Sequence, residues 1–253
     1  MKKILSLLAA TAALVASVNA FATSACPQFF PNGQEPVLTN PKMTNGARDL
    51  CFHAYAVEHS ALTHTPLWSS EHLTRDNIKS AKEEVRTNRF YAEPSLPQGE
   101  GSQLADYRKS GFDRGHQSPA GDMPDDVSMS ESFSLANMVA QDPTMNRVIW
   151  MHLESYVRRM AMQRGELFVT TGPLFLGQTL KTIGPDHVVV PTHMFKVVYD
   201  PRDKIAFAVV VENINTNDYT IKTVHEMEAM SGIRYPGIPE ALKDQKIGAL
   251  NGV

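Results

Sequence analysis

Five consecutive residues, Asp113, Arg114, Gly115, His116 and Gln117, place several groups with chemical potential in one short stretch. The imidazole of His116 titrates near neutral pH, so it can take a proton from water. The guanidinium of Arg114 is a planar fork that binds phosphate oxygens, and Gly115 leaves clearance for a bulky substrate. A short polar stretch beside a glycine is often only a loop. If the stretch is an active site, it combines a base, a group that binds an anion and space for a bulky substrate. This combination favours hydrolysis of a phosphodiester bond.

A second group of candidate residues lies on a helix that we predict over residues 144–163, where apolar side chains recur at helical spacing. Asn146, Trp150, Glu154 and Arg158 follow one another at intervals of four and form one slowly rotating row. One interpretation is a solvated face whose Glu–Arg pair contributes roughly 0.2–0.5 kcal/mol. The other is an oxygen ligand, an aromatic wedge, a carboxylate and a phosphate clamp directed at one place. Spacing alone does not choose between them.

The elements that must position these groups are those of one mixed α and β domain. The expected strands, rich in apolar, aromatic and β-branched residues, are 50–57, 61–68, 167–171, 188–199 and 205–212, the last two joined by a turn at 200–203. Further helices are expected over 74–86, with Asp76 as the N-cap, and over 222–230. Residues 21–48 are predicted to form an irregular arm, 91–106 a long loop, and the residues from 234 a tail.

The first twenty residues have the composition of a signal peptide. Two lysines precede an apolar run over residues 4–18, and small residues end at Ala20, where cleavage is expected. The run is short for a membrane span, and no stop-transfer pattern follows it. We therefore expect removal of residues 1–20, a single domain with a sizeable core over residues 21–253, and an exported protein, periplasmic or secreted, that has no membrane anchor.

The two cysteines of the chain are Cys26 and Cys51. An exported location permits a disulfide between them, which would stabilise the fold by about 3 kcal/mol in the chain-entropy model. Two buried, unpaired thiols are the alternative. We favour the bridge because exposed thiols rarely stay reduced in an oxidising compartment.

The overall charge is unusual for a protein that binds nucleic acid. The formal net charge is −3, and it becomes −5 when Lys2 and Lys3 leave with the signal peptide. Nucleic-acid enzymes usually carry a basic surface, but whole-chain charge says little about one site. Residues 145–164 carry four arginines against one glutamate, and Arg108 and Lys109 stand just before the central motif. We therefore expect an acidic body with one basic cleft.

Together these residues resemble a known family, the DNA/RNA non-specific endonucleases, which include secreted bacterial nucleases and mitochondrial endonuclease G. The matching residues are Asp113-Arg114-Gly115-His116, followed by Asn137, Gln141, Asn146, Trp150, Glu154 and Arg158. Thr171-Gly172-Pro173 and residues 190–196 are also similar, so the likeness covers most of residues 50–235. Ala140 stands where the family often has proline. The resemblance implies an α+β, ββα-metal fold with an antiparallel sheet core flanked by helices and long loops.

The resemblance also implies the reaction and its central residues. His116 would be the general base in a sugar-non-specific endonuclease that hydrolyses phosphodiester bonds of DNA and RNA. Asn146 would be the sole direct protein ligand of Mg²⁺, or of Mn²⁺ or another divalent ion. A single neutral ligand suits Mg²⁺, which keeps most of its waters. Glu154 would accept hydrogen bonds from those waters.

The remaining roles concern charge and scaffolding. Arg114 and Arg158 would steady the phosphate, together with either Arg86 or Arg89, both of which are candidates for one further arginine of the family. Asp113 is expected to orient its loop rather than to react. Asn137 and Gln141 are expected to be supporting polar groups near the site.

The expected partners are DNA and RNA, bound through the phosphate backbone because phosphate contacts carry no base identity. Whether an inhibitor protein or a second copy of the chain binds is left open. Two other classes of function are also open: a binding or toxin-like module that has lost catalysis, and an exported phosphatase or phosphodiesterase for small esters. The intact His116, Asn146 and Glu154 argue against the first. The lack of the usual cluster of Asp and His ligands argues against the second.

Overall fold

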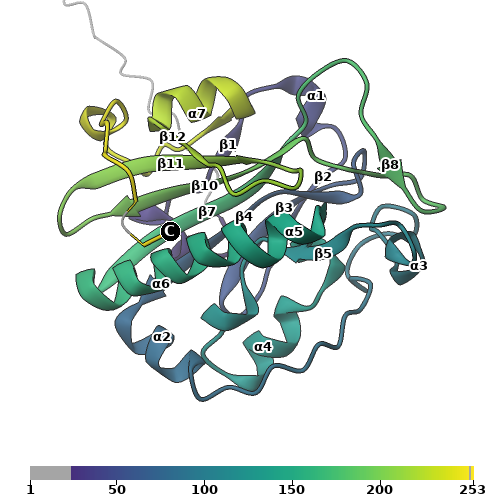
Figure 1. The fold of residues 1–253 in the computed structure, drawn as a ribbon, viewed down its shortest axis with the longest axis horizontal. Helices are drawn as coiled ribbons and strands as arrows, with labels where there is room; N and C mark the ends of the chain where they lie inside the picture. The colour runs from purple at the N-terminus through teal and green to yellow at the C-terminus, as the bar shows by residue number, and fades with distance from the viewer. Residues whose placement is uncertain (1–23, 251) are drawn as a thin grey trace, which may run out of the picture.

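The structure, a computed structural model, describes residues 24–250, 252 and 253, and the expected signal peptide lies outside these residues. In chain order the strands and α-helices are β1 (Val37–Leu38), α1 (Pro41–Thr44), β2 (Ala47–Cys51), β3 (Tyr55–Ser60), β4 (Thr65–Thr74), α2 (Arg75–Ala81), α3 (Leu104–Tyr107), β5 (Asp113–His116), α4 (Asp126–Ser132), β6 (Met138–Gln141), α5 (Pro143–Met145), α6 (Met151–Arg164), β7 (Glu166–Leu174), β8 (Thr182–Ile183), β9 (Val188–Val189), β10 (His193–Asp200), β11 (Ile205–Glu212), β12 (Thr220–Lys222), α7 (Val224–Ser231) and β13 (Ile233–Arg234) (Figure 1).

The core of the molecule is a seven-stranded sheet in the order β12-β11-β10-β7-β4-β3-β2, in which every neighbouring pair is antiparallel. The predicted turn between β10 and β11 is confirmed, and Asp200 Oδ1 closes it by accepting the backbone N–H groups of Arg202 and Asp203. Within residues 24–250, three two-stranded sheets lie outside the core, and one of them pairs β5 with β6. The expected α+β architecture with an antiparallel sheet is confirmed.

Side chains of the sheet alternate between two apolar layers. In β10, Phe195, Val197 and Tyr199 belong to one layer, whereas Met194 and Val198 belong to the other. The first layer is covered by α7 and the N-terminal arm, and the second by α6 and α2. Figure 1 shows α6 lying across the sheet on the face turned to the viewer. The sheet is therefore enclosed by helices on both faces.

The long helix predicted over residues 144–163 is confirmed, with one irregular turn. It begins after Asp142, whose side chain accepts the N–H groups of Thr144 and Met145, and it ends before Gly165, which has a φ of 104°. Between α5 and α6 the turn over Asn146–Trp150 is π-helical. Such single π turns recur at functional sites, because they shift which side chains face the same way.

The two strands predicted before residue 70 are placed correctly in the sheet but their ends are wrong. Residues 50–57 are divided by a turn between β2 and β3, in which Phe52 N–H donates to the Tyr55 carbonyl. Residues 61–64 form the next turn, held by the Ser60 hydroxyl, and β4 runs on to Thr74. Apolar composition located these strands, but the hydrogen bonds of the turns, backbone to backbone at Phe52 and side chain to backbone at Ser60, accompany the points where they stop.

Two other expected elements are shorter than predicted. The helix expected over 74–86 ends at Ala81, its last buried residue, and its N-cap is Thr74 rather than Asp76. The strand expected over 188–199 is interrupted at Pro191, which cannot donate a ladder hydrogen bond. By contrast, β11 has the predicted bounds, and α7 lies within two residues of its prediction.

The predicted disulfide between Cys26 and Cys51 is confirmed, with the two Cα atoms 5.9 Å apart. It ties the N-terminal arm to β2. Cys26 is buried beside Phe29, Phe30 and Trp68, in the apolar layer that α7 covers. The bridge therefore fastens the arm to the face of the sheet opposite α6.

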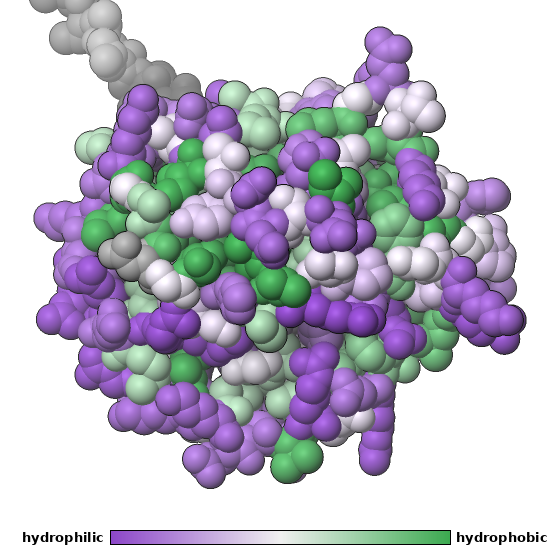
Figure 2. All heavy atoms as spheres, in the orientation of Figure 1, coloured by the Kyte–Doolittle hydropathy of each residue, from purple (hydrophilic) through white to green (hydrophobic). Residues whose placement is uncertain are grey.

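Hydrophilic side chains make up most of the outline of the molecule in Figure 2, and hydrophobic ones show between them in patches. In the part of the chain that the structure describes, no helix is both long enough and apolar enough to cross a membrane.

Candidate active site

The central motif forms strand β5, which pairs with β6 so that His116 lies opposite Met138 and Asp113 opposite Gln141. A Cβ atom at Gly115 would overlap the Gln141 side chain. The clearance expected for a substrate at this glycine is therefore filled by the protein itself. Gly115 is needed for the close packing of the two strands, and Gln141 is fully buried beneath the site.

Asn137 fixes the chain immediately after the motif. Its side chain accepts the N–H of Ser118 (2.9 Å) and donates to the carbonyls of Ser118 (2.8 Å) and Ser132 (3.0 Å). Its backbone carbonyl also accepts the N–H of Gln117. All of these groups are buried, so the amide holds the end of β5 against the end of α4.

His116 lies in an aromatic setting. Its ring meets Phe133 edge-on at a centroid distance of 5.1 Å, and Phe90 lies 5.9 Å away. Burial lowers the pKa of His116 to about 3, and the positive charge of Arg86 acts in the same direction. Among the described residues, none makes a hydrogen bond with its buried Nε2. The ring is therefore neutral at pH 7.

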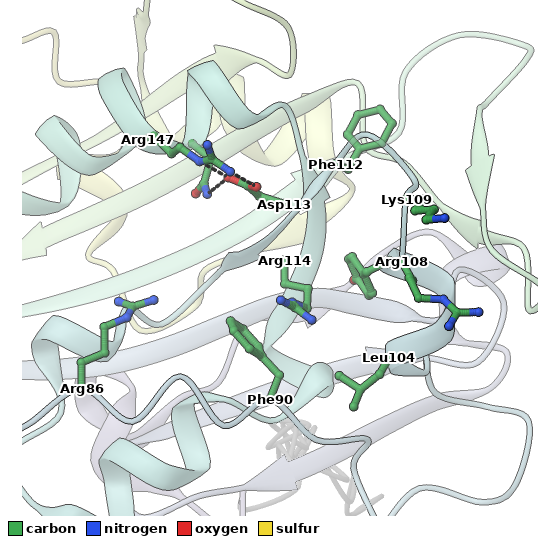
Figure 3. Close-up of a pocket in the computed structure, with 11 residues that line it drawn as sticks. Arg86, Phe90, Leu104, Arg108, Lys109, Phe112, Asp113, Arg114 and Arg147 are labelled. Carbon is green, nitrogen blue, oxygen red and sulfur yellow. Dashed lines mark hydrogen bonds and ion pairs between the residues drawn. The ribbon is translucent and has the colours of Figure 1, made fainter.

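Asp113 joins the motif to the long helix. Asn146 Nδ2 donates to Asp113 Oδ2 at 3.0 Å, and Arg147 binds both carboxylate oxygens, at 2.8 and 2.7 Å. Figure 3 shows the Arg147 guanidinium directed at Asp113. Because the amide nitrogen of Asn146 is turned toward the carboxylate, its amide oxygen is left for another partner. Asp113 thus orients the helix residue as well as its own strand.

The structure brings most of the predicted residues together in one cleft of about 330 Å³. The predicted residues that line it are Arg86, Arg114, His116, Asn146, Glu154 and Arg158. Arg86 is thus the arginine that reaches the site, whereas Arg89 lines neither this cleft nor the cavity beside it. Asp113 lines that neighbouring cavity, and the fully buried Asn137 and Gln141 lie below the surface.

Trp150 departs from the predicted row. It is fully buried, and Met151 lines the cleft instead. The π turn explains the difference, because each of its turns holds more than four residues and so carries Trp150 toward the core. Asn146, Glu154 and Arg158 still face the cleft.

Three buried ionisable residues behind the cleft were not anticipated from the sequence: Glu71, Asp122 and Lys196. Asp122 accepts a hydrogen bond from Arg158 at 2.8 Å, so it holds that guanidinium in place. Lys196 donates to Thr171 Oγ1 at 2.8 Å and lies 4.9 Å from the ring centroid of Trp150. Lys196 was recognisable in the sequence as a lysine inside an otherwise apolar strand, which indicates a buried ionisable group. Alternation along the strand places it on the α6 face of the sheet.

Electrostatics link these buried groups to the cleft. Burial raises the pKa of the Glu154 carboxyl, while the positive charges of Lys196 and Arg158 act against that rise. Burial lowers the pKa of the Lys196 ammonium, and the carboxylates of Glu154 and Glu71 oppose the change. Each buried charge therefore depends on partners of opposite sign, as a buried ionic cluster requires.

The donor atoms in the cleft fit a divalent cation that keeps most of its water. An amide oxygen on Asn146, held in orientation by Asp113, and a carboxylate on Glu154 are hard oxygen donors on the same helix. Within the described residues, no three His, Cys, Asp or Glu side chains are grouped so that they could enclose an ion. This set resembles the sparse protein coordination typical of Mg²⁺ rather than a closed cage.

The antiparallel sheet, the β5–β6 pair and the long helix that carries Asn146 are the parts of a ββα-metal nuclease fold. Residues 34–237 match the family described as DNA/RNA non-specific endonuclease, and the chain belongs to that family.

Several known proteins are similar to this chain in sequence. The chain is 35% identical over 158 residues to "Nuclease 1, mitochondrial" of Schizosaccharomyces pombe, covering 58% of this chain and 49% of the relative. It is 35% identical over 170 residues to "Nuclease C1" of Cunninghamella echinulata var. echinulata, covering 61% and 66%. It is 33% identical over 155 residues to "Endonuclease G, mitochondrial" of Bos taurus, covering 57% and 52%. The chain thus spans from about half to two thirds of the length of these relatives.

One solved structure with the same fold is a chain from the crystal structure of the EndoG/EndoGI complex, a work on the mechanism of EndoG inhibition. The TM-score is 0.71 at 28% sequence identity, and the alignment covers 77% of this chain and 88% of that one. The expected family and fold are therefore confirmed by sequence and by structure.

Proposed function

We propose that this protein is an exported, Mg²⁺-dependent endonuclease that hydrolyses phosphodiester bonds of both DNA and RNA. One observation carries the proposal: neutral His116 lines the same cleft as the oxygen donors Asn146 and Glu154 and the phosphate-binding groups Arg86, Arg114 and Arg158. A base, a hard-cation site and anion clamps in one cleft are the requirements of phosphodiester hydrolysis. Membership of the endonuclease family supports the same conclusion.

In this proposal His116 is the general base. A neutral imidazole carries a lone pair on one of its two ring nitrogens, and that nitrogen can accept a proton from the attacking water. The rings of Phe90 and Phe133 pack around the imidazole and restrict its rotation. Restricted rotation keeps the base aligned with the water at the moment of reaction.

Asn146 would hold the cation through its amide oxygen, and Glu154 would accept hydrogen bonds from the waters that the cation retains. When bound, a divalent ion offsets phosphate charge and stabilises the leaving oxygen. Asp113 contributes by keeping the amide nitrogen of Asn146 turned away from the ion.

Arginines would stabilise negative charge on the nonbridging phosphate oxygens. Arg114 lies on β5 with His116, the charge of Arg86 acts on His116, and Arg158 is held on the helix by Asp122 and Ser155. The cleft and the cavity beside it are lined by six Arg or Lys side chains against two carboxylates. This local excess of positive charge supports binding of nucleic acid despite the acidic whole chain.

Recognition through phosphates explains why both DNA and RNA are proposed substrates, since these contacts carry no base identity. Export is proposed from the composition of the first twenty residues. The disulfide between Cys26 and Cys51 supports it, because disulfides persist in oxidising compartments.

The decisive experiment uses protein that begins after Ala20, supercoiled plasmid and single-stranded RNA. We expect cleavage of both substrates with Mg²⁺, no cleavage with a chelator, and recovery when Mg²⁺ is restored. His116→Ala should lower turnover by about 10²–10⁴-fold and leave DNA affinity nearly unchanged. His152→Ala, which changes an exposed histidine on α6, is the matched control.

Three results would contradict the proposal. Cleavage that continues in chelator would show that no divalent cation is needed. Full activity of His116→Ala would show that His116 is not the general base. Turnover of a nitrophenyl phosphate ester without any cleavage of DNA or RNA would instead indicate a phosphatase or phosphodiesterase of small esters.

A further inference from the structure

A cavity of about 640 Å³ adjoins the cleft and shares Arg86, Arg114, Asn146 and Arg147 with it (Figure 3). Its volume lies in the range of pockets that hold small organic ligands, roughly 300–1,000 Å³. A strand whose scissile phosphate lies at His116, and which continues past the shared residues, places a neighbouring nucleotide in or beside this cavity. The chemistry of its walls therefore bears on which substrate fits.

Part of the wall is apolar and aromatic. Phe90, Leu104, Tyr107 and Phe112 all line the cavity. Figure 3 shows Phe90 and Leu104 below Arg114, and Phe112 above it. Leu104 is 45% exposed. A single exposed leucine is common on protein surfaces and needs no explanation. Four apolar or aromatic side chains in one basic cavity form a surface that binding of phosphate alone does not explain.

Two of these rings already make cation–π contacts. The Arg114 guanidinium lies 4.1 Å from the centroid of Phe90, and the Lys181 ammonium lies 4.6 Å from that of Phe112. Nucleobases stack on aromatic rings and on guanidinium planes, and this stacking tolerates every base because each base has a π face.

Positively charged side chains around the cavity are suited to bind the phosphate backbone of a nucleic acid. Arg86, Arg108, Lys109 and Arg114 line the cavity together with Arg147. Asp113 is the carboxylate among the lining residues, and it is already paired with Arg147. Cations at the rim and aromatic groups on the wall are the combination that single-stranded nucleic acid binds.

We propose that this cavity is a flanking-base pocket, which holds the unstacked base of a nucleotide next to the scissile phosphate. The proposal rests on the proposed nuclease function and specifies its substrate: single-stranded or locally unpaired nucleic acid binds more tightly than continuous duplex. In a duplex both faces of a base are covered by its neighbours, and extracting the base costs a few kcal/mol. The preference concerns strand state and not base identity.

The test compares binding of two single-stranded oligomers of equal length, oligothymidine and a fully abasic oligomer with the same phosphates. Fluorescence anisotropy with chelator present measures both dissociation constants without turnover. We expect wild-type protein to bind oligothymidine about 5- to 100-fold more tightly than the abasic oligomer. We also expect oligothymidine to bind more tightly than a duplex of the same length.

Two variants locate the effect. Phe112→Leu keeps an apolar side chain but removes the ring, and Leu104→Ala shortens the exposed wall. Both should bring the ratio of the two dissociation constants toward one, with a smaller change for the abasic oligomer. A ratio is unaffected by a fraction of unfolded protein, since that fraction lowers binding of both ligands. Leu62→Ala, at an exposed leucine in the β3–β4 turn, is the matched control and should keep the wild-type ratio.

A wild-type ratio near one would overturn the base pocket and leave a cavity that binds phosphates only. An unchanged ratio in both Phe112→Leu and Leu104→Ala would overturn it as well, because stacking would then occur elsewhere. The nuclease proposal fails separately: wild-type protein that shows the expected ratio yet never cleaves with Mg²⁺ would contradict catalysis while retaining the pocket.

Discussion

At the scale of single residues, surroundings decide what each histidine can do. The exposed His53 forms a hydrogen bond with Glu131, which raises its pKa. His116 is buried between aromatic rings near Arg86, and its pKa falls to about 3. The same side chain is thus favoured as a cation in one place and as a neutral base in the other. The second is without its proton at neutral pH, which is the form that a general base requires.

The depressed pKa of His116 predicts how stability depends on pH. Between the ordinary value of 6.5 and about 3, the unfolded chain binds a proton at this histidine and the folded chain does not. The free energy of unfolding should therefore fall as pH decreases through this window, by about 1.4 kcal/mol per pH unit from this group alone. His116→Gln removes this dependence.

Urea denaturation of both proteins between about pH 7 and about pH 4 measures the effect. The stability difference between wild type and His116→Gln should shift in favour of the variant as the pH falls. Parallel pH profiles for the two proteins would contradict a neutral, buried His116.

Asp113 gives a second prediction at this scale. Asp113→Leu removes the acceptor that orients the Asn146 amide, so the Mg²⁺ concentration for half-maximal cleavage should rise by about 10- to 100-fold. Arg147→Ala is the matched comparison, because it removes the ion pair with Asp113 but leaves the Asn146 contact. Its Mg²⁺ requirement should stay close to wild type. Equal shifts in the two variants would show that Asp113 acts through the ion pair instead.

At the scale of elements, the site depends on three pieces held against one another: β5 with His116, the loop and helix α4 behind it, and the long helix with Asn146. Asn137 connects the first two through buried hydrogen bonds, and Asp113 connects the first and third. The π turn then decides which face of the long helix meets β5. A small displacement at any of these contacts would move His116 relative to Asn146.

Asn137→Ala should therefore act through stability. It leaves buried backbone groups of Ser118 and Ser132 without their partner, which we expect to lower the free energy of unfolding by about 2–5 kcal/mol. Asn215→Ala, at an exposed asparagine, should change it by less than about 0.5 kcal/mol. Denaturant unfolding of both variants gives the measurement. A stable Asn137→Ala protein without activity would place Asn137 among the reacting groups.

At the scale of the whole molecule, the sheet separates the candidate active site on one face from stabilising contacts on the other. The α6 face carries the cleft, and the opposite face is closed by α7 and by the N-terminal arm with its disulfide. Stabilising contacts on one face can therefore change without moving the residues on the other. This arrangement also lets an acidic body carry a locally basic cleft.

The double variant Cys26→Ser with Cys51→Ser tests this separation. The bridge spans 25 positions of the chain, so its loss should lower the free energy of unfolding by about 3–4 kcal/mol. Turnover at a temperature well below the melting transition should remain near wild type, because the arm lies away from the cleft. Thermal melting and plasmid cleavage of the variant, with reduced wild-type protein as the control, measure both. Loss of turnover in fully folded variant would link the arm to the site.

The sequence by itself determined the features that depend on local spacing. Runs rich in apolar, aromatic and β-branched residues located the strands of the sheet, and intervals of four and eight residues placed Asn146, Glu154 and Arg158 on one side of a helix. The short block from Asp113 to His116 carried the family resemblance. These relations hold because the geometry of a strand or helix repeats along the chain, whatever packs around it.

Only the tertiary structure decided the features that depend on distant segments. It selected Arg86 over Arg89, buried Trp150, brought Lys196 and Asp122 behind the cleft, and set the pKa of His116. It also joined Phe90 and Phe112 in one cavity, although a long loop separates them in the chain. Burial and loop position result from packing between elements far apart in sequence, and no local pattern records them.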